Sequence, residues 1–131
     1  MTAANDARAT VDAWMRAMHG GDFAAARSLL AADVVFRFDA DPPLGGERTR
    51  PDGVFEFFGQ LAAVVGSPTR GAMLDLLAGD RYALELYERE VEVEGEPTTA
   101  RIAVLYEVRA GLIVAVDYLP VDRDAFESMR R

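Results

Sequence analysis

The sequence predicts an α+β fold, in which a cone-shaped, curved antiparallel sheet wraps around an N-terminal helix and encloses a pocket. Two observations carry this prediction. Apolar residues recur at helical spacing in the first half of the chain, and the second half holds four apolar β runs separated by hairpin signals. At 131 residues the chain fits one domain over residues 1–131, which is large enough to bury a single hydrophobic core.

The first half of the chain is expected to form three helices. The first carries apolar residues on one face from Ala7 to Met18 and ends at "HGG". Asp22 then caps a short second helix with Phe23 on its inner side. A third helix starts near Asp52 and buries a set of apolar residues at helical spacing, namely Val54, Phe57, Phe58, Leu61 and Val65.

Strands are expected to make up most of the rest. A short strand at about residues 34–38 precedes a loop rich in Pro and Gly, and a short helix is expected from Asp122. In the second β run, Tyr82, Leu84 and Leu86 alternate and the apolar parity then changes, which predicts a bulge near residues 86–88. The signals "GD", "EGEP" and "RAG" predict an antiparallel meander of about residues 72–78, 81–94, 97–109 and 111–119.

Composition excludes several classes of function. A formal net charge of −8 argues against nucleic acid and against anionic membrane surfaces. The chain has no Cys and one His, His19, which we interpret as a helix-end residue, so we expect neither a metal site nor a cofactor. No apolar run is long enough to span a bilayer and the N-terminus lacks the core of a signal peptide, so a cytoplasmic location is expected.

Two long segments carry a family resemblance. "WMRAMHGGDFAAARSLLAADVVFRF" and, after a loop and a helix, "GDRYALELYEREVEVEGEPTTARIAVLYEVRAGLIVAVDYLP" resemble the SnoaL-like polyketide cyclases and ketosteroid-isomerase-like proteins of the nuclear transport factor two superfamily. The markers are "GD" after the first helix, "AxD" before the first strand and a meander that ends in "G-x-I-V…Y". The resemblance implies a cystatin-like cone, and it leaves activity open because the superfamily includes isomerases, cyclases, epoxide hydrolases and non-catalytic binding modules.

The residues of the ketosteroid isomerases carry over only in part. Their oxyanion hole would need a Tyr where this chain has Trp14 and an Asp where it has Ala103 or Val104, so ordinary steroid isomerisation is disfavoured. Their general base precedes a Pro after the first strand, and the resemblance places that role on Asp41, with Asp39 nearby.

A second candidate acid comes from the last strand. SnoaL-like cyclases and limonene-epoxide-hydrolase-like enzymes carry an acid directly before a Tyr there, and "VDYLP" supplies Asp117 and Tyr118. If Asp117 faces the pocket, burial should raise its pKa toward the range that suits proton transfer. If it faces outward or pairs with an Arg, it is a structural acid. The charged run from Glu88 to Glu94, which contains Arg89, is expected to be a solvated strand end.

Two classes of function therefore remain. The first is a cofactor-independent cyclase- or isomerase-type enzyme that moves a proton on a polyketide- or steroid-like carbonyl compound, with lyase or epoxide hydrolase chemistry less favoured. The second is a non-catalytic binding or dimerisation module. Ala103 and Leu105 on the outer sheet face predict a homodimer. The partner in either case is a small apolar molecule, bound in a pocket lined by Trp14, Met18, Phe36, Phe38, Phe58, Leu86, Tyr106 and Tyr118.

Overall fold

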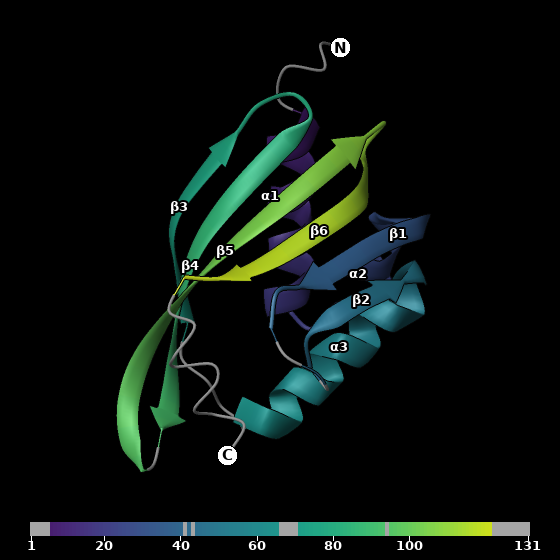
Figure 1. The fold of residues 1–131 in the computed structure, drawn as a ribbon. Coiled ribbons are helices and arrows are strands. Elements are labelled where there is room, and N and C mark those ends of the chain that lie inside the picture. Colours follow the sequence, from purple (N-terminus) through teal and green to yellow (C-terminus); the bar gives the residue numbers. More distant parts are fainter. Residues whose placement is uncertain (1–5, 41, 43, 66–70, 94, 122–131) are drawn as a thin grey trace.

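The computed structural model describes residues 6–121 apart from 41, 43, 66–70 and 94, and it omits the side chains of 64–65 and 91–93. Six strands form one curved sheet in the order β2-β1-β6-β5-β4-β3, and the helices gather on one of its faces (Figure 1). The predicted α+β architecture is confirmed. The elements are α1 (Asp6–His19), α2 (Phe23–Ser28), β1 (Leu30–Phe38), β2 (Gly46–Thr49), α3 (Arg50–Val65), β3 (Gly71–Ala78), β4 (Tyr82–Val93), β5 (Glu96–Arg109) and β6 (Leu112–Pro120).

The four strands of the predicted meander, β3 to β6, pair antiparallel in sequence order. β1 then joins β6 in parallel, and β2 adds an antiparallel edge strand. β1 starts at Leu30, four residues before its expected start at Val34. β2 was not predicted, because "GERT" has no apolar alternation and the strand is held by backbone pairing to β1 alone.

Helix α1 is tied to the sheet at two places. The β5–β6 turn is a two-residue hairpin in which Ala110 and Gly111 have φ of 52° and 74°, as a tight turn of this kind requires. The Gly111 N–H donates to the Asp6 carboxylate at 3.1 Å, and Arg8 Nη2 donates to the Leu76 carbonyl of β3 at 3.1 Å. These bonds fix the start of α1 across the inner face of the meander.

The expected bulge is found, but on the neighbouring strand. Met73 pairs with Tyr87 and Asp75 pairs with Leu86, so the extra residue belongs to β3, while the register of β4 with β5 is unbroken. The inward residues of β4 therefore start from Ala83, and Tyr82, Leu84 and Leu86 lie on the opposite face. Because the outer face of β4 is also apolar, hydrophobicity alone does not distinguish its two faces.

Aromatic rings join α3 to the sheet. Phe57 is fully buried, with its ring centroid 4.6 Å from Phe36 and 5.2 Å from Phe38 on β1. Phe23 was expected to point inward, and that prediction is wrong, because 55% of it is exposed. α2 spans six residues and buries only Ala26, so its first residue stays at the surface.

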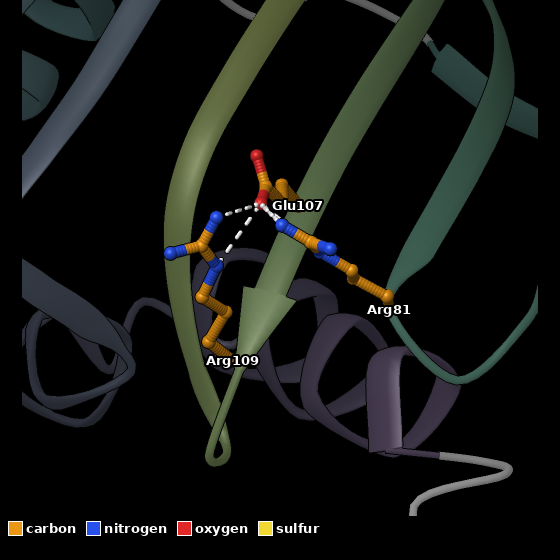
Figure 2. A network of polar contacts seen from close by, with 3 residues as sticks. All are labelled: Arg81, Glu107 and Arg109. Atoms are coloured by element: carbon orange, nitrogen blue, oxygen red, sulfur yellow. Dashed lines mark hydrogen bonds and ion pairs between the residues drawn. The ribbon is translucent and has the colours of Figure 1, made fainter.

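Charged side chains on the outer face of the sheet are paired. Figure 2 shows Glu107 of β5 between Arg81 and Arg109, each of which places a guanidinium nitrogen 2.9 Å from the Glu107 carboxylate. The hydrogen bond from Arg81 lowers the pKa of Glu107, and Arg109 adds to this effect. No helix among the described residues covers this face.

Some predictions fall outside what the structure describes. The helix expected from Asp122, the Val65 side chain and Asp41 all belong to this group. Among the described helices, none combines the length and the apolar character needed to cross a membrane.

The aromatic packing gives a first prediction. Phe57→Ala should lower the free energy of unfolding by about 3–5 kcal/mol, because it empties a fully buried site. Phe23→Ala removes the same ring from an exposed position and should cost less than about 1 kcal/mol. Urea unfolding of both variants checks this, and equal losses would contradict the assignment of Phe57 to the core.

Candidate functional site

A cavity of about 190 Å³ lies between α1 and the inner face of the sheet. Its walls combine aromatic rings, methionines and a small number of polar groups. The lining residues are Trp14, Met15, Met18, His19, Phe58, Glu85, Tyr87, Arg89, Val104, Tyr106 and Tyr118.

The end of α1 determines where one wall of the cavity stops. The Asp22 N–H donates to the Ala17 carbonyl at 2.9 Å, and the Gly21 N–H donates to the Met18 carbonyl at 3.3 Å. Gly21 has φ of 74°, so the helix ends in a Schellman motif. The last helical residue is therefore His19, which contributes to the cavity wall next to Met18.

Glu85 of β4 is a carboxyl group inside the cavity. It is only 6% exposed, and the Tyr106 hydroxyl donates a hydrogen bond of 2.9 Å to its Oε1. Burial raises the pKa of Glu85, and the hydrogen bond from Tyr106 and the nearby His19 oppose this shift only in part. Within the described residues, no arginine forms an ion pair with Glu85. Burial in the cavity therefore holds the pKa of Glu85 above its ordinary value.

Two tyrosines lie close to this carboxyl. Burial raises the pKa of Tyr106 well above its ordinary value, and the charge of Glu85 adds to the rise. Burial also raises the pKa of Tyr118 to about 12. Both phenols therefore keep their protons at neutral pH and can act as hydrogen-bond donors, as Tyr106 does to Glu85.

Arg89 and Tyr87 continue the inner face of β4 beyond Glu85. The Arg89 guanidinium carbon lies 5.9 Å from the centroid of the Tyr87 ring. Arg89 Nε is buried and has no hydrogen-bond partner among the described residues. A Cβ on Gly71 of β3 would overlap the Tyr87 hydroxyl, so glycine at this position allows the ring to lie across the strand.

The structure brings most of the predicted pocket residues together. Phe36 and Phe38 were also expected to line the pocket, but neither is among its lining residues, and both are buried in the aromatic cluster around Phe57. Leu86 is directed to the outer face, where it pairs with Ala103, so its expected place in the pocket is wrong. The predicted residues that do line the cavity are Trp14, Met18, Phe58, Tyr106 and Tyr118.

Neither predicted catalytic acid is found in the cavity. Asp117 is directed to the outer face, with its Oδ1 3.3 Å from Arg37 Nη1, because Tyr118 takes the inward position on β6. Of the two alternatives stated for Asp117, this placement matches the second, an outward-facing structural acid that pairs with an arginine. Asp41 lies outside the described residues. Asp39 is exposed and lines a separate surface hollow together with Arg37 and Asp117.

Sequence reasoning missed Glu85, Tyr87 and Arg89 of β4, and it gave His19 only a helix-end role. Arg89 was expected to be solvated, and instead it lines the cavity. The turn at "EGEP" held the missing signal. Pairing the two residues that flank "EG" and counting back along both strands places Glu85 opposite the apolar Val104, which predicts a shared inward face.

A second hollow of about 620 Å³ adjoins the cavity and is almost entirely apolar. The two spaces share Met18 and Phe58, so a ligand body longer than one ring has an apolar surface on which to extend. Its lining residues are Met18, Phe23, Ala24, Arg27, Phe55, Phe58, Gly59 and Ala62.

The polar groups of the cavity define its chemistry. A protonatable carboxyl, phenol donors and a guanidinium surround an aromatic-lined space, which suits the binding of an oxygen-bearing apolar compound and proton transfer on it. Over the part of the chain that is described, no group of three or more His, Cys, Asp or Glu side chains lies close enough to hold a metal ion.

Comparisons with known proteins agree with this architecture. A family model for the SnoaL-like domain matches residues 11–116. A comparison with curated protein sequences finds no match.

Solved structures of similar fold cover almost the whole chain. Bal32a, from a soil-derived mobile gene cassette, has a TM-score of 0.86 at 17% identity, covering 99% of this chain and 100% of its own. An NTF2-like protein of unknown function from Burkholderia pseudomallei has a TM-score of 0.80 at 21% identity over 100% of both chains. TerC, co-crystallised with polyporic acid, has a TM-score of 0.80 at 18% identity and covers 96% of this chain and 99% of its own. At these identities the likeness shows the fold alone, and it confirms the predicted fold class.

Glu85 gives a prediction on pH dependence. Because its pKa is raised in the folded state, its contribution to stability is complete below the ordinary carboxyl pKa and is lost as pH rises through the folded value. Glu85→Gln keeps an acceptor for Tyr106 and removes this loss. We expect the variant to match the parent at acidic pH and to exceed its free energy of unfolding at neutral pH.

Urea unfolding between about pH 4 and pH 8 measures this difference. Glu107→Gln is the matched control on the outer face, and its sign should be opposite. The pKa of Glu107 is lowered, so its stabilising effect is present above the ordinary pKa and is lost as pH falls through the folded value. A Glu85→Gln variant that loses more stability at neutral than at acidic pH would show that burial does not destabilise the charged Glu85 carboxylate.

Proposed function

The chain belongs to the SnoaL-like domain family, which includes cyclases and isomerases, and we propose that it binds a small, largely apolar carbonyl compound beneath α1 and moves a proton on it. One observation carries the proposal: a buried carboxyl, Glu85, is hydrogen-bonded to Tyr106 inside an aromatic-lined cavity. A carboxyl whose pKa is raised toward the working pH is suited to general acid–base catalysis. In this proposal Glu85 is the base, a role that the sequence analysis assigned to Asp117 and Asp41.

The chemistry uses side chains of this chain only. Ionised Glu85 takes a proton from a carbon next to the ligand carbonyl, and the electron pair of that C–H bond moves to the carbonyl oxygen. The Tyr118 phenol, with a pKa of about 12, stays protonated and can donate a hydrogen bond to the enolate oxygen. Glu85 then returns the proton to carbon, at the same position or at a conjugated one, and is ready for another cycle.

A protein of similar fold supports the proposed ligand class. TerC was co-crystallised with polyporic acid, a small organic molecule. In the present chain, Trp14, Phe58, Tyr106 and Tyr118 offer a comparable compound a mostly apolar wall. The adjoining hollow extends this wall through Met18 and Phe58.

The alternative is a binding or dimerisation module without chemistry. Asp117 favours it, because the one acid that a resemblance to cyclases implied for the last strand lies outside the cavity, paired with Arg37. Both alternatives use the same cavity and predict ligand binding. They differ in whether Glu85 exchanges a proton with the ligand.

Proton exchange separates the two alternatives. We expect the protein to speed deuterium incorporation next to the carbonyl of 2-tetralone in D₂O, as followed by NMR. Because the base is ionised Glu85, the rate should rise as pH rises through its raised pKa. Glu85→Gln should lower the catalysed rate by about a hundredfold or more.

Asp117→Asn is the matched control, and it should leave the exchange rate unchanged because that carboxylate faces away from the cavity. Binding of 2-tetralone that perturbs Trp14 fluorescence, without any catalysed exchange, would favour the binding module. An equal loss of rate in both variants would argue against Glu85 as the base.

We further propose that the outer face of the sheet pairs with a second copy of the chain. Leu84 and Leu105 face each other across β4 and β5 there, and Leu86 faces Ala103. Charged residues flank this apolar strip, with Glu107 next along β5 and Asp117 beside Leu105 on β6. An apolar centre with a charged rim is typical of isologous dimer interfaces.

Light scattering tests the dimer. The native chain should have about twice its single-chain mass of 14.3 kDa at micromolar concentration. Leu105→Arg should give the single-chain mass, because it places a long charged side chain in the apolar centre of the interface. Phe23→Arg, on the helical side, should remain dimeric. A native chain with the single-chain mass would contradict the proposal.

A further inference from the structure

Arg89 has a donor that nothing in the described structure satisfies. Its Nε is buried and has no hydrogen-bond partner there, although the side chain lines the cavity. The guanidinium carbon lies 5.9 Å from the centroid of the Tyr87 ring, which offers a stacking surface but no acceptor in line with Nε. A buried donor without an acceptor costs about 1–3 kcal/mol, and more when the group is charged.

The arginines of the outer face behave differently. Arg37 pairs with Asp117 and Glu47, while Arg81 and Arg109 share Glu107. Among the described residues of β4, the acid that shares the inner face with Arg89 is Glu85. It lies four residues earlier, which puts about 13 Å between the two Cα atoms along the strand. Glu85 accepts its hydrogen bond from Tyr106 instead. The cavity therefore separates a cation at one end from a carboxyl at the other.

We propose that Arg89 binds an anionic oxygen of the ligand, so that the compounds taken by this cavity are small aromatic or alicyclic acids, as carboxylates or stable enolates. A guanidinium matches the two oxygens of such a group. The inference rests on the proposed function for the location of the ligand and not for proton transfer. It adds the class of ligand and the direction in which the ligand lies.

Size and direction follow from the walls. A cavity of about 150 Å³ accepts benzene, so the space of about 190 Å³ accepts one ring with a carboxylate. With its oxygens at Arg89, the ring lies along Tyr87 and Trp14, and its far side approaches Glu85. Larger acids extend past Phe58 into the apolar hollow.

Matched pairs of probes test the inference. Benzoate and benzamide, and 2-naphthoate and 2-naphthamide, share their ring and differ in charge. Binding is followed by calorimetry and by the fluorescence of Trp14, the single tryptophan. We expect each carboxylate to bind about tenfold or more tightly than its amide, since a charge-assisted pair replaces a neutral hydrogen bond.

Variants of Arg89 assign the preference to this residue. Arg89→Met keeps the apolar stem and should weaken carboxylate binding about tenfold while leaving the amides unchanged. Arg109→Met removes the same charge from the outer face and should change neither probe. Arg89→Lys keeps the charge and should keep a preference for the carboxylate, which provides a second reading if Arg89→Met does not fold.

The outcomes separate this inference from the proposed function. Equal affinity for acid and amide, with Trp14 perturbed by both, would overturn the role of Arg89 and leave the apolar ligand site standing. A carboxylate preference that survives in Arg89→Met would overturn it as well. Failure of all four probes to bind would overturn the role of Arg89, and the proposed function would then stand or fall on binding and proton exchange of 2-tetralone.

Discussion

The alternation of β4, held in register by β5, decides what the cavity contains. The pairing runs without a break from Tyr82 opposite Glu107 to Val93 opposite Glu96. Because side chains on a strand alternate between faces, this register sends Glu85, Tyr87 and Arg89 under α1. A slip of one residue would place Leu84, Leu86 and Glu88 there instead, and would turn Tyr87 and Arg89 to the outer face. The chemistry of the site thus depends on backbone hydrogen bonds some distance from it.

Sequence reasoning succeeded where the periodic signal was strong. α1 and the meander were predicted because one apolar helical face and three hairpin turns admit a single interpretation. On α1, Trp14 and Met18 reached the cavity as expected. On β4 the placement of Leu86 in the pocket was wrong. Both faces of this strand carry apolar residues, so hydrophobicity alone does not indicate which face is inward. Asp117 shows the same difficulty on β6, where an acid in an apolar run lies outward beside Arg37.

Carboxyl groups on the two faces of the sheet have pKa values shifted in opposite directions. On the outer face Glu107 lies between two arginines, and its pKa is lowered. On the inner face Glu85 has only a phenol as partner, and its pKa is raised. Arg89 completes the contrast with its unsatisfied Nε. Burying an unpaired charged or polar group lowers stability. In proteins such groups are found mainly at sites that bind a ligand or catalyse a reaction. The hydrogen bonds that tie α1 to the sheet help to hold Trp14 of α1 over Glu85 and Arg89.

Glu85 is, in this proposal, a buried carboxyl at the ligand site whose charged form is destabilised by burial. A titration of its side-chain carboxyl by ¹³C NMR, assigned with Glu85→Gln, tests this claim most directly. We predict a pKa above the ordinary value for Glu, opposite in direction to the shift of Glu107 in the same spectrum. A Glu85 pKa at or below the ordinary value would contradict the account, because the carboxyl would then be charged and well solvated.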